Sequence, residues 1–247
     1  MGQNNLPEGP EASMINFLLG IAASLLASFI FAFLVYGRTV FQLRGRDIIL
    51  LWSVTRRLSA NGIINFFATR ADYIKYRQNG TVTKYIRTAE RELIYVGLWL
   101  SHGIEMANIR ETLESLLEHG CYVELIFLDP TVRYIESLAD FLALSTDSVV
   151  TRINQSIYQM TSLKDSLPEN LKPRFVLKAH SKLTTSSAFL IDQDTEHARV
   201  LIDFKLYGLG REQSFGIEFQ RVAAADSLYS RVVSSFMEIR RQARAIA

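Results

Sequence analysis

A run of 23 residues without a charged side chain, residues 14–36, constrains this chain more than any other feature. As an α-helix the run would be about 34 Å long at roughly 1.5 Å per residue, which is enough to cross the core of a bilayer. A cleaved signal peptide would begin with basic residues, but the preceding leader carries Glu8 and Glu11 and neither lysine nor arginine. We therefore expect a retained transmembrane helix over residues 14–36, preceded by an extracytoplasmic tail over residues 1–13.

The charges that flank this run predict its orientation. The near side holds only acidic residues, whereas the far side holds five arginines and one aspartate, namely Arg38, Arg44, Arg46, Asp47, Arg56 and Arg57. Because positive flanks tend to stay in the cytoplasm, we expect a single-pass protein of a bacterial inner membrane, with its N-terminus outside and its C-terminal domain cytoplasmic. The lone Cys121 excludes an intrachain disulfide and suits a reducing compartment.

Small residues recur every four positions within the run, at Gly20, Ser24 and Ser28. On a helix they would form one stripe, and such stripes let two helices approach closely in lipid. The sequence thus predicts a homo-oligomer joined through the transmembrane helix, although the stripe is equally compatible with a span that does not associate.

Residues 37–62 form a basic juxtamembrane segment that includes Trp52. Two arrangements suit it: it lies in the headgroup region in contact with membrane lipid, or it is a charged flank that leads into the first strand. Residues 58–247 hold 22 lysines and arginines and 22 aspartates and glutamates, so the soluble part is neutral. This balance does not indicate nucleic acid as a partner, although a local basic patch would still allow it.

Residues 63–247 alternate between strand and helix patterns. Apolar runs predict strands at residues 63–68, 92–100, 122–130, 174–180, 187–192, 198–204 and 214–219. Helical patterns occupy residues 71–78, 81–92, 105–119, 131–144, 147–167 and 226–244. Gly120 is typical of a helix end, and Ser145-Thr146-Asp147 is a capping signal between the helices expected at residues 131–144 and 147–167. This order predicts a cytosolic α/β domain with a mixed sheet.

Polar side chains lie at the ends of three expected strands. Ser101 and His102 follow the strand at residues 92–100, Asp129 ends the next strand, and His180 ends the strand at residues 174–180. Ligands of α/β sheets bind beyond the carboxyl ends of the strands. If these strands are parallel neighbours, the four side chains share one rim.

His180 alternates with Lys178 along its strand, so both side chains point to the same face, and Lys182 would continue the row. As a polar residue at a strand end, His180 is expected to contribute little to the core.

The triplet His180-Ser181-Lys182 at a strand end, followed by further strands and by Glu218, resembles one half of a phospholipase D-superfamily site. The resemblance covers roughly residues 63–247 and implies a phospholipase D-like half. It implies that His180 attacks phosphorus, that Lys182 neutralises the phosphate oxygens, and that Glu218 belongs to the catalytic set. The family uses two copies of the motif and this chain has one, so a complete site would need a homodimer.

The chain departs from the family at two points. The position that the family fills with aspartate is Ser187, and the nearest aspartate is Asp192. The glycine/serine-x-asparagine element is missing, and only Gly208, Gly210 and Ser214 lie nearby.

Three interpretations of this stretch stay open. It is an active phosphodiesterase site, a degenerate site that binds an anionic ligand, or the solvated face of an edge strand. In the second case the expected ligand contacts are Lys178, Ser101, His102, Asp129 and Ser214. No metal-ligand cluster or phosphate-binding glycine loop is recognisable, so no metal and no cofactor is predicted.

One membrane helix joined to one cytosolic domain is a layout similar to the membrane effectors of bacterial anti-phage defence systems. We expect a domain that senses a ligand or a defence-system partner protein, on a chain that acts as a membrane effector, or toxin. The alternative is a membrane-anchored homodimeric phosphodiesterase that acts on phospholipid or nucleic acid. Whether the chain is an enzyme therefore stays open.

Overall fold

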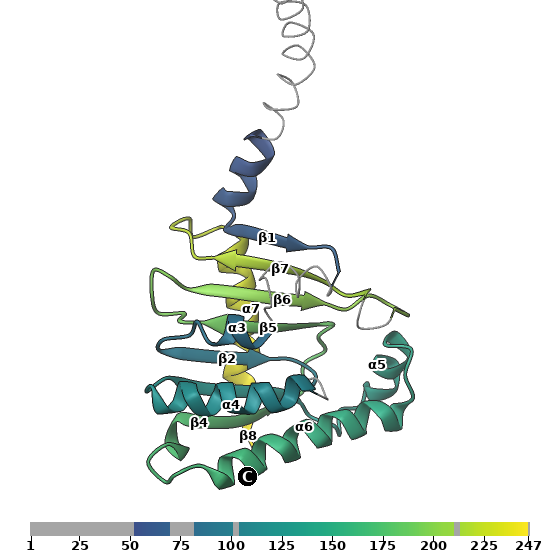
Figure 1. Ribbon diagram of the computed structural model, residues 1–247. Helices are drawn as coiled ribbons and strands as arrows, with labels where there is room; N and C mark the ends of the chain where they lie inside the picture. Colours follow the sequence, from purple (N-terminus) through teal and green to yellow (C-terminus); the bar gives the residue numbers. More distant parts are fainter. Residues whose placement is uncertain (1–51, 70–81, 101–103, 210–212, 247) are drawn as a thin grey trace, which may run out of the picture. The chain divides into compact units, whose positions relative to one another are not determined.

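The computed structural model describes residues 52–69, 82–100, 104–209 and 213–246 (Figure 1). The chain divides into two compact units, Met1–Arg56 and Arg57–Ala247. The expected tail and transmembrane helix lie outside the described residues, as do Ser101 and His102. Among the residues that are described, no helix is long and apolar enough to cross a bilayer.

The second unit is built on one eight-stranded mixed sheet, which confirms the predicted α/β class (Figure 1). Along the sheet the strands follow the order β1-β7-β6-β5-β2-β3-β4-β8. Their bounds are β1 Ile63–Phe67, β2 Glu92–Val96, β3 Tyr122–Leu128, β4 Phe175–His180, β5 Ser186–Ile191, β6 Arg199–Phe204, β7 Phe215–Gln220 and β8 Arg244–Ala245.

β2, β3 and β4 are parallel neighbours, and the other pairs of adjacent strands are antiparallel. β2 and β3 are nearly continuous apolar runs because side chains on both faces of the sheet are covered there. The carboxyl ends of the three parallel strands meet at one edge of the sheet, so the expected rim exists for Asp129 and His180.

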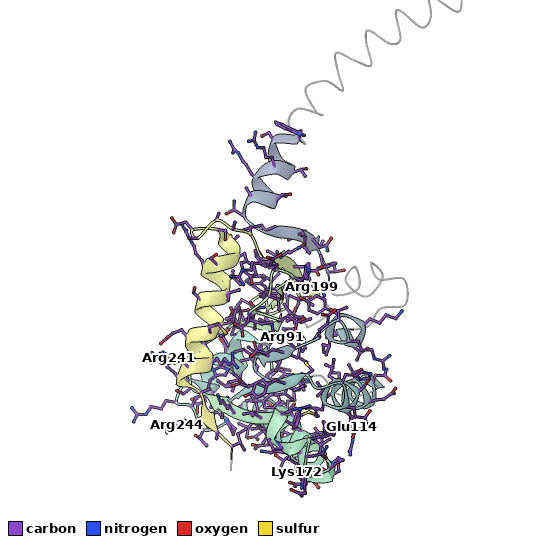
Figure 2. The ribbon with its side chains drawn as sticks, turned by 90° about the vertical axis from the view of Figure 1, so that its left-hand side faces the viewer. Arg91, Glu114, Lys172, Arg199, Arg241 and Arg244 are labelled. Carbon is purple, nitrogen blue, oxygen red and sulfur yellow. The ribbon has the colours of Figure 1, made fainter. Side chains whose placement is uncertain are left out.

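Helices cover both faces of the sheet. α7 (Leu228–Gln242) packs on the face that presents Ile94, Ile126 and Val200. On the opposite face, α4 (Ile104–Glu118) and α6 (Thr146–Ser166) take part in the core that holds Leu93 and Leu125. Figure 2 views the sheet from its side, with Arg241 of α7 and Glu114 of α4 labelled on opposite sides of it.

Two predicted helix boundaries are confirmed. Ser145 is the N-cap of α6, and its side chain accepts a hydrogen bond from the backbone N–H of Ser148 at 3.2 Å. Gly120 follows the end of α4 with φ of 89°, a left-handed conformation that glycine adopts without steric cost.

Two expected helices are much shorter than predicted, and one observed strand was not predicted. The expected helix at residues 131–144 is only α5 (Ile135–Phe141), because Ala143 takes a left-handed φ of 53° and stops it. The helix expected over residues 81–92 is only α3 (Val82–Ile86). Beyond it the backbone turns, and the N–H of Arg91 donates a hydrogen bond to the carboxylate of Asp192, which directly follows β5. The chain ends in β8, a short strand paired with β4 that was not predicted.

Candidate functional site

The rim at the carboxyl ends of β3 and β4 brings Asp129 and His180 together through the backbone. The N–H of Asp129 donates to the carbonyl oxygen of His180 at 2.9 Å. The Asp129 carboxylate accepts hydrogen bonds from the N–H and the hydroxyl of Thr131, at 2.8 and 2.7 Å. These bonds lower the pKa of Asp129, so the carboxylate is held ionised at the rim by its own loop.

His180 is buried, and both ring nitrogens face backbone groups. Its side chain is only 2% exposed. Nε2 lies 3.3 Å from the carbonyl oxygen of Gly97, and Nδ1 lies 3.3 Å from the N–H of Lys182. The neutral tautomer with its proton on Nε2 satisfies both contacts. Burial lowers the pKa of the imidazole, which favours this neutral form. The expectation that His180 contributes little to the core was therefore wrong.

Neither lysine of the expected row forms a cluster with the imidazole. Lys182 is exposed and lies beyond the end of β4, where its backbone N–H rather than its ammonium group contacts His180. The ammonium group of Lys178 lies 2.7 Å from Oε1 of Glu124, a carboxylate with no exposed surface. Lys178 thus points to the same face as His180, as predicted, but it is engaged in an ion pair.

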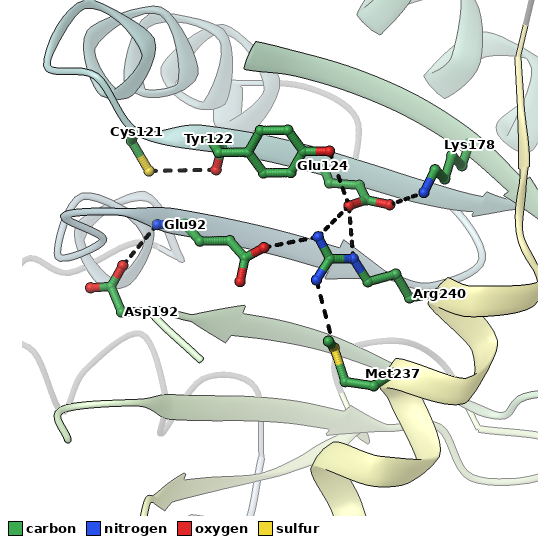
Figure 3. Close-up of polar contacts among 8 residues, drawn as sticks. All are labelled: Glu92, Cys121, Tyr122, Glu124, Lys178, Asp192, Met237 and Arg240. Atoms are coloured by element: carbon green, nitrogen blue, oxygen red, sulfur yellow. Dashed lines mark hydrogen bonds and ion pairs between the residues drawn. The ribbon is translucent and has the colours of Figure 1, made fainter. Parts of the chain in front are cut away.

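The partner of Lys178 belongs to a network that ties α7 to the sheet (Figure 3). Arg240 of α7 contacts Oε2 of Glu124 through Nε at 2.8 Å and through Nη2 at 2.7 Å. The same Nη2 lies 2.8 Å from Oε1 of Glu92 on β2. Two carboxylates and two cations balance, which is the condition under which charges are tolerated in a protein interior.

Glu218 is not brought to His180. Strand register places Glu218 opposite Leu201, and continues across the sheet through Phe189, Tyr95 and Leu125 to Leu177. Since side chains alternate along a strand, Glu218 faces the side opposite to Lys178 and His180. It is 1% exposed, and its Oε2 accepts a hydrogen bond from the amide of Asn65 at 2.5 Å.

Ser187, at the position of the family's aspartate, also lies on the face opposite to His180. Its hydroxyl oxygen is 2.9 Å from the ammonium group of Lys205, which follows β6. Gly97 separates Ser187 from His180: a Cβ atom at Gly97 would come within 2.7 Å of the Ser187 hydroxyl. A larger residue at this position would have to displace the Tyr95 and Ser187 side chains.

A pocket of about 360 Å³ opens on the Ser187 side. Strands β2, β5, β6 and β7 and helices α3, α4 and α6 contribute to its wall, together with the loops that flank them. Most of the lining is apolar, and the polar members include Ser187, Ser214, Asp203, Lys205 and Arg152. Small-molecule sites have this make-up, a concave apolar wall with a few convergent polar groups, and volumes from roughly 300 Å³ upward.

Of the residues predicted as ligand contacts, this pocket includes Ser214 alone among the described ones. Sequence reasoning missed Lys205 and Arg152. Asp129 was predicted as a ligand contact because it lies at the end of a strand. Lys205 also directly follows a strand, and the same rule would have identified it if it had been applied to antiparallel strands as well. Arg152 gives no such signal, because it is one of several polar residues on a long amphipathic helix.

The described residues contain no group of three or more histidine, cysteine, aspartate or glutamate side chains that could hold a metal ion.

No protein-family model matches the sequence, and no curated protein matches it. Among solved structures, the chain is similar to TrmBL2, an archaeal chromatin protein described with a novel mode of DNA binding, at a TM-score of 0.41 and 11% identity over 99% of this chain and 75% of that one. It is also similar to phosphatidylserine synthase of Haemophilus influenzae, at a TM-score of 0.44 and 12% identity over 69% of this chain and 37% of that one. Both TM-scores lie below 0.5, so the function proposed next rests on the geometry of the site itself.

Proposed function

We propose that this chain is a single-pass protein of a bacterial inner membrane whose cytoplasmic domain acts by binding rather than by hydrolysis. In this proposal the domain senses a ligand, and the chain is a membrane effector of an anti-phage defence system. The site of sensing is the pocket beside Ser187 and Lys205, not the stretch around His180.

One observation carries the proposal. A histidine that attacks phosphorus needs an accessible nitrogen with a free lone pair, and a cation that holds the phosphate beside it. In His180 one nitrogen faces a carbonyl oxygen and the other an N–H, both within 3.3 Å, and 2% of the side chain is exposed. The open volume and the convergent polar groups lie on the other face of the sheet.

The runner-up is a homodimeric phosphodiesterase acting on phospholipid or nucleic acid. The observation in its favour is that His180 does lie at the carboxyl edge of the parallel strands, with the exposed Lys182 next to it. The two proposals make opposite predictions for substitutions on the two faces of the sheet.

His180→Gln should leave the activity of the chain in cells unchanged, because a glutamine amide still offers an N–H to the Gly97 carbonyl. Leu144→Trp should abolish that activity, because it adds an indole to the pocket wall from a half-buried loop position. The measurement is the number of colony-forming cells after induced expression, with wild type expected to reduce it. Leu206→Trp, on an exposed side chain outside the lining, is the matched control and should behave as wild type.

Loss of activity in His180→Gln or in Lys182→Ala, with Leu144→Trp fully active, would establish the phosphodiesterase instead. A wild-type chain that leaves viability unchanged would contradict the effector role.

The predicted topology has its own test. A reporter that works only in the cytoplasm should be active when fused after Ala247, because five arginines flank one side of the uncharged run and none the other. A reporter that requires the periplasm should be inactive at the same position. The reverse result would place the domain outside and rule out a cytoplasmic ligand.

A further inference from the structure

The charge of the pocket wall points to an anionic ligand. Among the described residues of its wall, the charged side chains are Arg152, Lys205 and Asp203, two cations against one anion. Lys205 lies 3.8 Å from Asp203, so these two charges offset each other locally. Arg152 makes no ion pair with a carboxylate within the described part of the chain; its guanidinium instead lies 5.8 Å from the centre of the Trp99 ring.

Each aromatic side chain of the wall is in contact with another aromatic ring or with an arginine. Tyr95 and Phe189 have ring centroids 4.8 Å apart, and Phe215 stacks on Phe204 at 4.9 Å. Arg152 lies over the ring of Trp99. These contacts cover one face each of the Phe215 and Trp99 rings, so part of the aromatic surface on which a nucleotide base would stack is already occupied.

The rest of the apolar wall is aliphatic and includes Leu100, Ile109, Leu142, Leu144, Leu201 and Leu209. Branched aliphatic side chains bind hydrocarbon through area burial without demanding a planar shape. A pocket of about 360 Å³ is near the lower limit for small-molecule sites, so it suits a short chain rather than a two-tailed lipid.

We infer that the pocket binds a medium-chain aliphatic amphiphile with one anionic head group, a carboxylate or a phosphate monoester. Arg152 binds the head group, and the leucine-rich wall takes the chain. This inference rests on the proposed function, which it deepens by naming the class of ligand.

Trp99 makes the binding directly measurable, because the chain has two tryptophans and the other is Trp52. In full-length Trp52→Phe protein held in a polymeric amphipol, dodecanoate should change Trp99 emission and saturate at one molecule per chain. Dodecyltrimethylammonium, with the same chain and the opposite charge, should bind at least about tenfold more weakly, as should AMP, which lacks the chain. Dodecyl phosphate identifies which head group is preferred.

Arg152→Ala should raise the Kd for dodecanoate by about tenfold or more, since hydrogen bonds to charged groups are the stronger kind. It should leave the Kd for uncharged dodecanol within about twofold. A signal that does not saturate, equal affinity for the cationic amphiphile, tighter binding of AMP, or an unchanged Kd in Arg152→Ala would each overturn the inference.

Failure of this inference is distinguishable from failure of the proposed function. If Leu144→Trp abolishes activity in cells while dodecanoate does not bind, the pocket is the sensor and the class of ligand is wrong. If Leu144→Trp retains full activity, the proposed function itself fails.

Discussion

Replacing Arg240 by alanine should lower the free energy of unfolding by about 3–5 kcal/mol, the loss typical of a buried ion pair from which one partner is removed. Arg240 supplies two of the contacts to Glu124, whose carboxylate has no exposed surface, and one to Glu92. Without the guanidinium, Glu124 would keep only Lys178 as a cationic partner in the interior. Alanine is a good helix former, so the loss would come from the network and not from the helix itself.

The measurement is thermal unfolding of the full-length chain followed by circular dichroism, with a decrease in Tm on the order of 10 °C. The next residue of α7 provides the matched control. Arg241 pairs with Glu238 at the surface, and its side chain is 71% exposed, so Arg241→Ala should leave the Tm close to that of the wild type. Equal effects of the two substitutions would show that the network contributes nothing beyond a surface ion pair.

The strands were predictable because their signal is local. Each apolar run that predicted a strand overlaps an observed one, and the runs of β2 and β3 are continuous because these strands are covered on both faces. The caps of α6 and α4 were also local, since Ser145 and Gly120 act on residues within one turn. The early end of α5 was not predictable, because the residue that takes the left-handed conformation there is Ala143 and not a glycine.

The candidate site was less predictable because it depends on contacts between distant residues. Glu124 and Arg240 are 116 positions apart, and only the packing of α7 on the sheet makes them partners. Similarly, the sequence predicted that His180 lies at a strand end, but it could not show that the imidazole contacts the carbonyl oxygen of Gly97, 83 positions away. The pocket was missed for the same reason, since four strands and three helices must assemble before Lys205 and Arg152 share a wall.

Asp192→Ala should lower the free energy of unfolding by about 3 kcal/mol, because it removes the acceptor for three backbone N–H groups. The carboxylate of Asp192 accepts from the N–H of Arg91 at 2.8 Å, of Glu92 at 2.9 Å and of Glu90 at 3.0 Å, and Figure 3 draws the bond from Glu92. Asp192 also takes a left-handed φ of 52°, which alanine tolerates less well than aspartate or asparagine. The loss should appear as a lower Tm in the same unfolding experiment.

A second substitution at this position, Asp192→Asn, tests whether the Asp192 carboxylate has a functional role besides its structural one. Asp192 is the aspartate nearest in sequence to Ser187, the position that the phospholipase D superfamily fills with aspartate. It follows the end of β5 that pairs with the start of β2, whereas His180 contacts Gly97, which follows the opposite end of β2. Asp192→Asn keeps one carbonyl acceptor and tolerates the left-handed backbone, so it should lose only about 1–2 kcal/mol and keep full activity in cells. Asp194→Ala, on an exposed side chain of the same turn, should change stability by no more than about 0.5 kcal/mol. An Asp192→Asn protein that folds normally but has lost its activity would show that this carboxylate is functional, and the role assigned here, closing the turn before β2, would then be incomplete.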